Sequence, residues 1–299
     1  MKIGVPKEIK VHEYRVGLTP PSVAELVAAG HEVFVETGAG AGIDFDDAAY
    51  AAVGAQILGT AAEVFKAADM IVKVKEPQAR EIALLEARHT LFTYLHLAAD
   101  NDQALGLMKS GATCIAYETV TAPNRSLPLL KPMSEVAGRM AVQVGAHYLE
   151  KEQGGRGILL GGVPGVAPAK VAILGGGVSG LNAAQMAVGL RADVTIYDIS
   201  NDRLAELDTH FGNSIKTAYA SKAAIAAAVA NAHLVIGAVL VPGAAAPKLV
   251  TRDMLKTMKR GSVLVDIAID QGGCFETSHA TTHADPVFVE EGVIHYCVA

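Results

Sequence analysis

The sequence predicts an α/β protein built from two doubly wound, Rossmann-like domains. Short β-rich runs alternate with helical patterns along almost the whole chain, as they do in parallel sheets with crossover helices. A stretch with three prolines and no helical period, residues 121–132, interrupts this alternation. At 299 residues the chain also exceeds the size at which a single core usually keeps growing. We therefore expect two domains, residues 1–133 and 134–299.

Five strands are expected in the first half, at residues 2–6, 32–36, 70–75, 91–96 and 113–120. Helical patterns lie between them. One helix has a clear start and end, because Thr19 can cap it, Pro20 suits its first turn and Gly30 follows its last turn.

In the second half, a long helical pattern opens at Ser134 and Glu135 and runs to about Gln153. The alternation of strands and helices then resumes. Strands are expected at residues 170–174, 193–198, 233–239, 262–267 and 293–298.

Composition excludes several classes of protein. Hydrophobic residues make up 51% of the chain and charged residues 19%, which suits well-buried cores rather than disorder. The net charge is -6 and no cluster of Lys and Arg with interleaved aromatic residues occurs, so a nucleic-acid partner is not expected. The N-terminus is too polar for a signal peptide. Asn231, His233 and Pro242 interrupt the Ala-rich run at 223–246, which favours a helix and strand over a membrane span.

The sequence gives little support for a metal site or for disulfide bonds. The cysteines, Cys114, Cys274 and Cys297, are odd in number and form no C-x-x-C, which favours a reduced, cytoplasmic setting. His279 and His283 have ligand-like spacing, but the motif lacks the Glu of H-E-x-x-H and no third ligand is evident, so we expect no metal.

A glycine-rich segment predicts a dinucleotide site. Gly175, Gly177 and Gly180 have G-x-G-x-x-G spacing between a β-run and an Ala-rich helix, and Asp198 ends the next β-run. The glycines permit a tight turn, close approach to a pyrophosphate and close helix packing, in that order. Asp198 would bind the ribose hydroxyls and favour NAD, although Arg203 leaves NADP open. The alternative is a purely structural βαβ turn.

Four ionisable residues are candidates for a substrate site. Lys75, His96 and Asp270 follow or end β-runs, where ligands bind in open α/β sheets, and Arg15 follows the first β-run. Each has an alternative explanation when taken singly. Lys75 could be a solvated strand end and His96 a helix-entry residue. Asp270 could belong to a turn, and Arg15 could form a surface ion pair with Glu13. Their common placement in both halves of the chain favours a site in a cleft between the two domains.

The last β-run holds a second acid, Asp266, inside the strand pattern. Asp266 is expected to be structural, whereas Asp270 lies past the strand's carboxyl end, before Gln-Gly-Gly.

Eight segments together resemble the NAD-dependent alanine dehydrogenases along the whole chain. They are GVPKEIK (4–10), EYRVGLTP (13–20), KVKEP (73–77), YLHLA (94–98), PMSEVAG (132–138), LGGGVSG (174–180), GAVLVPG (237–243) and VDIAIDQGGC (265–274).

The resemblance implies a substrate-binding domain at 1–133 and an NAD-binding domain at 134–299. It implies that Arg15 and Lys75 hold the substrate's carboxylate and its oxo or amino group, that Tyr94 and Met133 line the pocket, and that His96 and Asp270 are the acid/base residues. The residues implied around NAD are Ser134, Gly175, Gly177, Val178, Gly180, Asp198, Arg203, Val239, Leu240, Ile267 and Asp270.

The reaction implied is the reversible oxidative deamination of L-alanine to pyruvate and ammonia, in a cytoplasmic homo-oligomer that is a hexamer by resemblance. Imidazole suits the proton transfers that this reaction needs near neutral pH.

Two departures from the family pattern are visible. Ala220, with Ser221 beside it, stands where family members often carry a Ser that contacts the adenosine. The family also continues past the position of Ala299, through a segment that completes the first domain and is lacking here.

Two rival functions remain. One is the NAD-binding component of a membrane proton-translocating transhydrogenase, and the other is an amino-acid dehydrogenase of the saccharopine or lysine type. The segments around His96 and Asp270 favour the alanine dehydrogenase.

Overall fold

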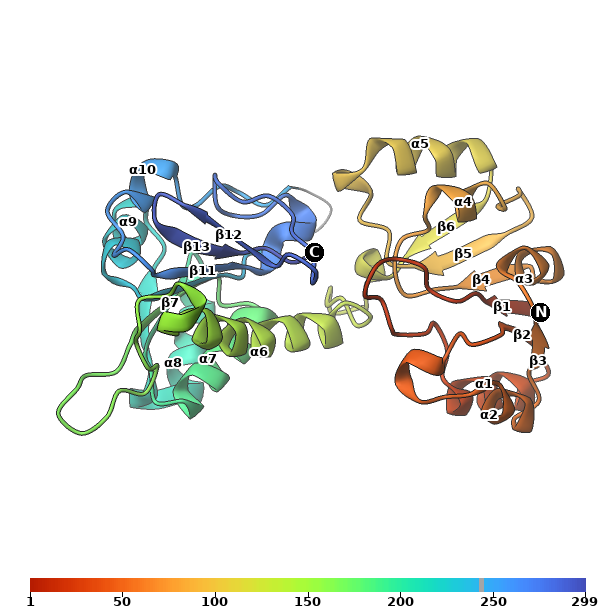
Figure 1. Ribbon diagram of the computed structural model, residues 1–299, viewed down its shortest axis with the longest axis horizontal. Coiled ribbons are helices and arrows are strands. Elements are labelled where there is room, and N and C mark those ends of the chain that lie inside the picture. The colour runs from red at the N-terminus through yellow and green to blue at the C-terminus, as the bar shows by residue number, and fades with distance from the viewer. Residues whose placement is uncertain (242–244) are drawn as a thin grey trace. The chain divides into compact units, whose positions relative to one another are not determined.

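The computed structural model describes residues 1–241 and 245–299, and the chain divides into two compact units, Met1–Leu130 and Lys131–Ala299. Each unit is a sheet covered by helices on both faces (Figure 1). The predicted fold class, with two doubly wound α/β domains, is confirmed. The boundary expected at 133/134 falls inside a helix that begins at Lys131.

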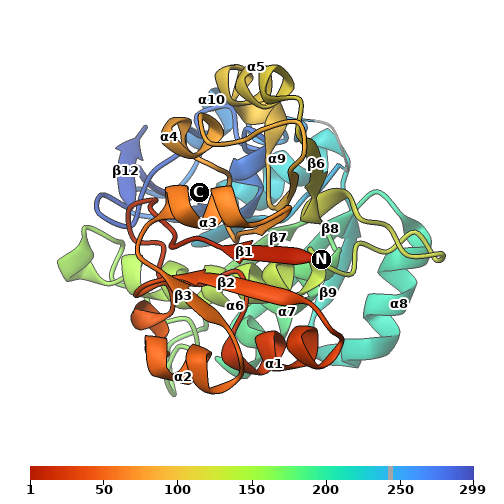
Figure 2. The same ribbon diagram turned by 90° about the vertical axis from the view of Figure 1, so that its right-hand side faces the viewer.

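The first unit holds a six-stranded, all-parallel sheet in the order β3-β2-β1-β4-β5-β6. Its strands are β1 (Lys2–Val5), β2 (Glu32–Glu36), β3 (Gln56–Leu58), β4 (Met70–Val72), β5 (Thr90–Thr93) and β6 (Thr113–Ala116). Its α-helices are α1 (Pro20–Ala28), α2 (Asp47–Ala52), α3 (Ala61–Ala67), α4 (Ala79–Ile82) and α5 (Asn101–Ser110). Figure 2 shows α1 and α2 on one face of the sheet and α3, α4 and α5 on the other.

The second unit holds a seven-stranded sheet in the order β12-β13-β11-β10-β7-β8-β9, with β12 alone antiparallel to its neighbour. Its strands are β7 (Lys170–Leu174), β8 (Asp193–Asp198), β9 (Lys216–Tyr219), β10 (Leu234–Gly237), β11 (Val263–Asp266), β12 (Val287–Glu290) and β13 (Val293–Tyr296). Its α-helices are α6 (Lys131–Tyr148), α7 (Val178–Gly189), α8 (Asn201–Phe211), α9 (Lys222–Asn231) and α10 (Arg252–Leu255). One hydrophobic core lies under α6, α7 and α8, and another under α9 and α10.

Three strands were not predicted, and all three are edge strands: β3, β9 and β12. Edge strands are short and partly exposed, so their sequences lack the continuous apolar run that marks a buried parallel strand. Several predicted runs also extend two or three residues past the observed strand. Residues 73–75, for example, follow β4 as loop, and there the Val74 N–H donates to the Glu8 carboxylate rather than to a neighbouring strand.

The long helix differs from its prediction at both ends. It was predicted to run to about Gln153, but α6 ends at Tyr148 and a separate 3-10 turn, Lys151–Gln153, follows. The long helix was predicted to open at Ser134 but α6 begins at Lys131, with Pro132 in its first turn, where proline is well tolerated. The prediction for α1 is confirmed in position: Thr19 is the N-cap, Pro20 begins the helix and Gly30 follows its end with φ +83°.

The close packing of α6 against α7 depends on one glycine. A Cβ on Gly138 would overlap the carbonyl oxygen of Ser179 and lie 3.0 Å from the Cβ of Asn182. Neither atom can move easily, since one is helix backbone and the other belongs to a buried side chain. Glycine is therefore required here for steric reasons rather than for a left-handed φ.

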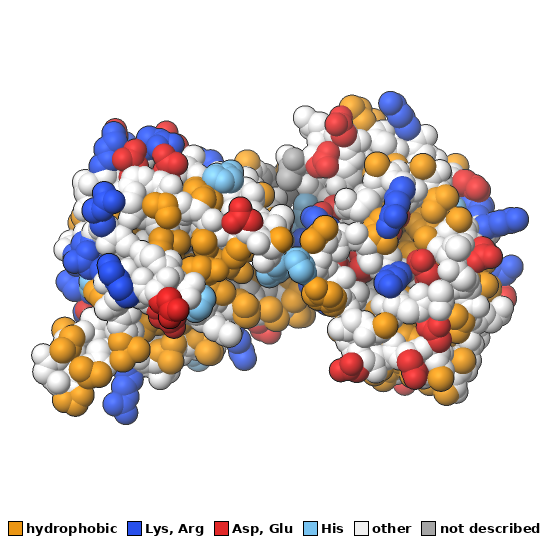
Figure 3. Space-filling view, viewed as in Figure 1, with side chains coloured by type: hydrophobic (Ala, Val, Ile, Leu, Met, Phe, Trp, Pro, Cys, Tyr) orange, Lys and Arg blue, Asp and Glu red, His pale blue; other side chains and the backbone are white. Residues whose placement is uncertain are grey.

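Charge is scattered over both units. On the face drawn in Figure 3, Lys and Arg side chains are interspersed with Asp and Glu. Exposed apolar side chains occur on the loop before β7, at Leu159, Val163 and Val166, and on α6 at Val136 and Met140. Within the described ranges, no helix combines the length and apolar character needed to cross a membrane.

Gly138→Ala is expected to destabilise the second unit by roughly 2–3 kcal/mol, because the new methyl group would push α6 away from α7. The matched control is Gly189→Ala at the exposed end of α7, where a Cβ would meet nothing within 4 Å. That substitution should leave stability unchanged or raise it by up to about 1 kcal/mol. Urea unfolding of both variants measures the difference, and equal midpoints would contradict the packing argument.

Candidate active site

Both sheets reverse their strand order near the centre, and the candidate residues lie at these reversals. In the first unit the order changes between β1 and β4, and in the second between β7 and β10. Loops that leave the carboxyl ends of such strands run in opposite directions and leave room for a ligand. The loop after β1 carries Arg15, the loop after β4 carries Lys75, and the loop after β7 is the glycine-rich segment.

Arg15 is held in place by Glu13. The Arg15 Nε donates to Glu13 Oε1 at 2.8 Å and a terminal nitrogen donates to Glu13 Oε2 at 2.5 Å, so the guanidinium grips the carboxylate with two parallel bonds. The Arg15 side chain is 42% exposed and that of Glu13 8%. Burial acts to raise the pKa of Glu13, but the hydrogen bonds and charge of Arg15 outweigh it and lower that pKa. The pair with Glu13, considered from sequence as an alternative to substrate binding, is thus present and orients the guanidinium.

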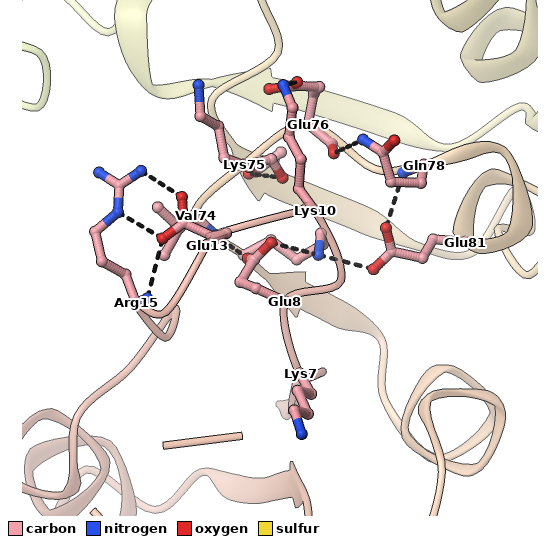
Figure 4. Close-up of polar contacts among 12 residues, drawn as sticks. Lys7, Glu8, Lys10, Glu13, Arg15, Val74, Lys75, Glu76, Gln78 and Glu81 are labelled. Atoms are coloured by element: carbon pink, nitrogen blue, oxygen red, sulfur yellow. Dashed lines mark hydrogen bonds and ion pairs between the residues drawn. The ribbon is translucent and has the colours of Figure 1, made fainter. Parts of the chain in front are cut away.

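Lys75 lies close to this pair. Its carbonyl oxygen accepts a 3.0 Å hydrogen bond from the Thr93 hydroxyl, and its charge also contributes to the lowered pKa of Glu13. Figure 4 shows the Lys75 ammonium and the Arg15 guanidinium extending to the same side of their adjoining loops. Two cationic groups therefore stand together at the strand reversal of the first unit.

Tyr94 and His96 follow β5. Their rings are stacked, with centroids 5.9 Å apart and planes 11° apart, and the Tyr94 hydroxyl donates to the Leu129 carbonyl at 2.7 Å. Burial raises the pKa of Tyr94, while the nearby charge of Arg15 acts to lower it, so the phenol lies within electrostatic reach of the guanidinium. The structure thus brings Arg15, Lys75 and Tyr94 together.

His96 has an unusual backbone conformation, with φ 49° and ψ 38°. Glu118 stabilises it, because its carboxylate accepts hydrogen bonds from the backbone N–H groups of Leu95 (3.1 Å) and His96 (2.7 Å). A left-handed conformation at a non-glycine residue costs about 1–2 kcal/mol and persists only where its surroundings fix it. Sequence reasoning identified His96 but missed Glu118, which fixes the backbone conformation from which the imidazole projects.

The glycine loop has the geometry expected of a phosphate-binding turn. Gly175 adopts φ +103°, and a Cβ there would lie 2.7 Å from the Ala238 carbonyl oxygen. A Cβ on Gly180 would overlap the carbonyl oxygen of Gly175, whereas one on Gly177 would meet nothing within 4 Å. The open space at Gly177, directly before the N-terminus of α7 at Val178, fits a pyrophosphate held by helix N–H groups.

Asp198, at the carboxyl end of β8, is bonded to this loop. One carboxylate oxygen accepts from Gly176 N at 2.7 Å and the other from Ser200 N at 2.9 Å. Arg203 donates to the Gly176 carbonyl at 2.6 Å and to Glu206 at 2.6 Å. Asp198, predicted to bind the ribose, and Arg203, predicted to lie near NAD, thus both fix the conformation of the loop.

The remaining cofactor candidates flank the same strand ends. Val239 and Leu240 follow β10, and Val239 packs 3.1 Å from where a Cβ of Gly175 would lie. Met133 and Ser134 lie half-buried in the first turn of α6. Pro242 and Gly243, which complete one of the sequence segments, lie outside the described residues.

Ala220 and Ser221 lie between β9 and α9. The Ser221 hydroxyl accepts from Ala224 N at 3.1 Å as the N-cap of α9. The Ala220 N–H donates to the Asp198 carbonyl at 2.9 Å, next to the glycine loop.

Ile267 and Asp270 lie in a 3-10 turn, Ile267–Gln271, directly after β11. Asp266 is 2% exposed and accepts hydrogen bonds from the backbone of Ala268 and Cys274 and from the Ser278 hydroxyl. Burial raises the pKa of Asp266, with those hydrogen bonds acting against it. Its structural role is confirmed, and Asp270 is left as the half-buried acid at the strand's carboxyl end.

Sequence reasoning also missed Lys248, whose ammonium donates to three backbone carbonyls of the segment after Asp270. The acceptors are Gly272 (2.5 Å), Gly273 (2.8 Å) and Phe275 (3.1 Å). Nothing in the sequence around Lys248 signals this contact, because its acceptors lie more than twenty residues away.

His279 lies outside any helix, as predicted, and its ring stacks on Phe288 with centroids 3.7 Å apart. In the described part of the chain, no three His, Cys, Asp or Glu side chains are grouped so that they could hold a metal ion. A cavity of ≈ 490 Å³ beside α9 is lined by Lys170, Asp193 and Lys216, at the amino ends of β7, β8 and β9, and so does not belong to this site.

Comparison with known proteins identifies clear relatives. The alanine dehydrogenase/PNT N-terminal and C-terminal domain models match residues 4–137 and 141–299. An alanine dehydrogenase from Halomonas elongata is 62% identical over 299 residues, which cover 100% of this chain and 81% of that relative. A solved L-alanine dehydrogenase superposes with a TM-score of 0.92 at 56% identity, covering 100% of this chain and 82% of that one. A transhydrogenase from Sinorhizobium meliloti superposes with a TM-score of 0.83 at 30% identity, covering 100% and 86%.

Lys248→Met is expected to loosen the turn after Asp270, because three carbonyls would lose their charged donor, and to destabilise the second unit by about 1–2 kcal/mol. Amide hydrogen exchange should become faster at Gly273 and Cys274. Lys256→Met, which removes an exposed lysine paired with Asp253 on α10, is the control and should leave exchange at these amides unchanged. Unaltered amide exchange in Lys248→Met would show that the turn keeps its conformation without the lysine.

Proposed function

The chain belongs to the alanine dehydrogenase/PNT family, and from this premise we propose that it catalyses the reversible, NAD-dependent oxidative deamination of L-alanine to pyruvate and ammonia. Its relatives make it an oxidoreductase, and the sequence-based resemblance to this family is confirmed. The substrate assignment rests on one observation: two cationic side chains, Arg15 and Lys75, lie near Tyr94 where the strand order of the first sheet reverses.

The two cations suit a small 2-oxo or 2-amino acid. The Arg15 fork can bind the substrate carboxylate, and Lys75 can hold the oxo or amino group beside it. The Tyr94 ring offers an apolar surface to the substrate, and its hydroxyl is held by a hydrogen bond to the Leu129 carbonyl. We propose Met133 as a further part of the pocket lining.

We propose NAD as the cofactor, since the open space at Gly177, the N-terminus of α7 and Asp198 fit a dinucleotide. Val178, Gly180, Val239 and Ile267 adjoin the same strand ends. Bound NAD would supply the acceptor for the hydride that leaves the substrate's Cα. A carboxylate at Asp198 would repel the 2′-phosphate of NADP, and Arg203 is occupied by Gly176 and Glu206.

Proton transfer is assigned to His96 and Asp270. Oxidation of an amino acid needs a neutral amine, followed by addition of water and loss of ammonia. An imidazole can transfer these protons, and we assign this role to His96, whose backbone is fixed by the Glu118 carboxylate. Asp270 can orient the water or stabilise developing positive charge.

The alternative function, the NAD-binding part of a transhydrogenase, draws support from the 30% identical transhydrogenase of similar fold. The 62% identity to an alanine dehydrogenase favours the dehydrogenase. We further propose a cytoplasmic homo-oligomer, a hexamer by family resemblance. The free thiols Cys114, Cys274 and Cys297 and the exposed apolar side chains on α6 and the loop before β7 support this proposal.

The decisive experiment mixes the protein with NAD and L-alanine and follows NADH absorbance. Asp270→Asn should reduce kcat by about 100-fold or more while NADH binding, followed by fluorescence, stays intact. Asp253→Asn, an exposed acid on α10, should behave as the unaltered protein does. If the unaltered protein fails to reduce NAD over a broad pH range, the transhydrogenase alternative is favoured. Near-normal kcat in Asp270→Asn would contradict the role of that residue alone.

Asp198→Ala should lower kcat/KM for NAD by about tenfold, because the ribose hydroxyls lose their hydrogen-bond acceptor. It should also lower the ratio of kcat/KM with NAD to that with NADP, because the carboxylate no longer repels the 2′-phosphate. Asp193→Ala, at the opposite end of the same strand, is the matched control and should keep the preference. The measurement is kcat/KM with each dinucleotide. An unchanged ratio in Asp198→Ala would show that another group selects the cofactor.

A further inference from the structure

The first unit contains a buried lysine to which the proposed mechanism gives no role. Lys73, the first residue after β4, has no solvent-exposed side-chain surface, and its ammonium lies 3.0 Å from Glu8 Oε2 and 2.7 Å from Glu81 Oε1. Both glutamate side chains are only 2% exposed. Glu8 comes from the loop after β1 and Glu81 from α4 (Figure 4).

Each glutamate uses its second oxygen to hold a backbone N–H group. Glu8 Oε1 accepts from Val74 N at 2.6 Å, and Glu81 Oε2 accepts from Gln78 N at 2.8 Å. These two N–H groups bracket the segment 74–78, and Lys75 lies inside it. The ion triad of Lys73, Glu8 and Glu81 therefore fixes both ends of the segment that presents Lys75.

The same triad also fixes the loop that presents Arg15. Glu8 belongs to this loop, seven residues before Arg15, and Lys10 two residues later forms an ion pair with Glu76, the neighbour of Lys75. Two cross-links thus join the loop after β1 to the loop after β4. Because Arg15 and Lys75 project from these loops, their separation depends on the cross-links.

Stability alone does not account for three buried ionisable groups. Removing charges from water is costly, and well-packed apolar residues in place of a buried ion pair are often equally or more stabilising. Burial raises the pKa of Glu8, with the charge of Lys73 and the Val74 N–H acting against it. Hydrogen bonds with fixed directions, in contrast, set loop geometry in a way that apolar contacts do not.

We propose that Lys73 is a positioning residue for the substrate carboxylate: through Glu8 and Glu81 it sets the spacing of Arg15 and Lys75, and so the affinity for a short 2-oxo or 2-amino acid. The inference rests on the proposed function. Lys73 itself touches no substrate. Loss of its ammonium frees both glutamates, loosens segment 74–78 and lets the two cations separate.

The test measures steady-state kinetics with pyruvate, ammonia and NADH. Lys73→Met should raise KM for pyruvate about tenfold or more, because misplacement of a binding group by even 1 Å is costly, while kcat at saturation falls less than about threefold. The affinity for NADH, measured by fluorescence, should not change, because the glycine loop belongs to the other unit. Amide exchange should become faster at Val74 and Gln78.

Two further variants keep the test sharp. Glu81→Gln retains the Lys73–Glu8 pair and an acceptor for Gln78, so it should fold even if Lys73→Met does not, and should raise KM for pyruvate in the same direction by a smaller factor. Phe65→Leu removes buried volume from α3 in the same unit, in an apolar cluster that contains no member of the triad. It controls for general destabilisation and should leave KM unchanged.

The outcomes separate the two proposals. If the unaltered protein turns over neither L-alanine nor pyruvate, the proposed function fails and this inference with it. If the unaltered protein is active but Lys73→Met and Glu81→Gln keep its KM for pyruvate, only the positioning role is overturned. The same holds if Phe65→Leu raises KM as much as they do, because the effect would then follow from destabilisation.

Discussion

Parallel pairing of the central strands is the constraint on which the rest of the structure depends. Because β1 pairs in parallel with β4, and β7 with β10, all four strands end at the carboxyl edge of their sheets. Neighbouring parallel strands cannot be joined by a tight turn, so each is followed by a loop that leads into a helix on one face or the other. At the reversal of strand order these loops diverge, and the polar groups they carry face a space that no helix fills.

The interior of both sheets was predictable from sequence, because buried parallel strands are continuous apolar runs. The runs at 32–36, 170–174 and 193–198 match β2, β7 and β8 residue for residue. Three edge strands, β3, β9 and β12, were not predicted, since half-exposed residues carry no such pattern, whereas the edge strand β6 was. The glycine loop was predictable for a related reason: its spacing reflects steric demands of the local backbone, and those demands are visible in the structure at Gly175 and Gly180.

Groups that position the candidate residues could not be predicted in the same way. Lys73 lies in an apolar run, and its partner Glu8 is 65 residues away in sequence. Glu118 reaches the backbone of His96 across 22 residues, and Lys248 reaches Gly272 across 24. In each case a side chain bonds to backbone or charge that only the fold brings near. Sequence patterns report the local backbone and the burial of a face, and they carry no record of such long-range contacts.

The contact between Gly138 and the backbone of Ser179 has a consequence for protein engineering. The glycine-rich turn and its helix are not a self-contained unit here, because α7 packs closely against α6 at a glycine that lies outside the motif. A graft of residues 170–189 alone would place α7 against a foreign helix whose side chains occupy that space. The smallest segment with matched surfaces runs from Lys131 to Gly189, so exchange of cofactor domains between relatives should keep both helices together.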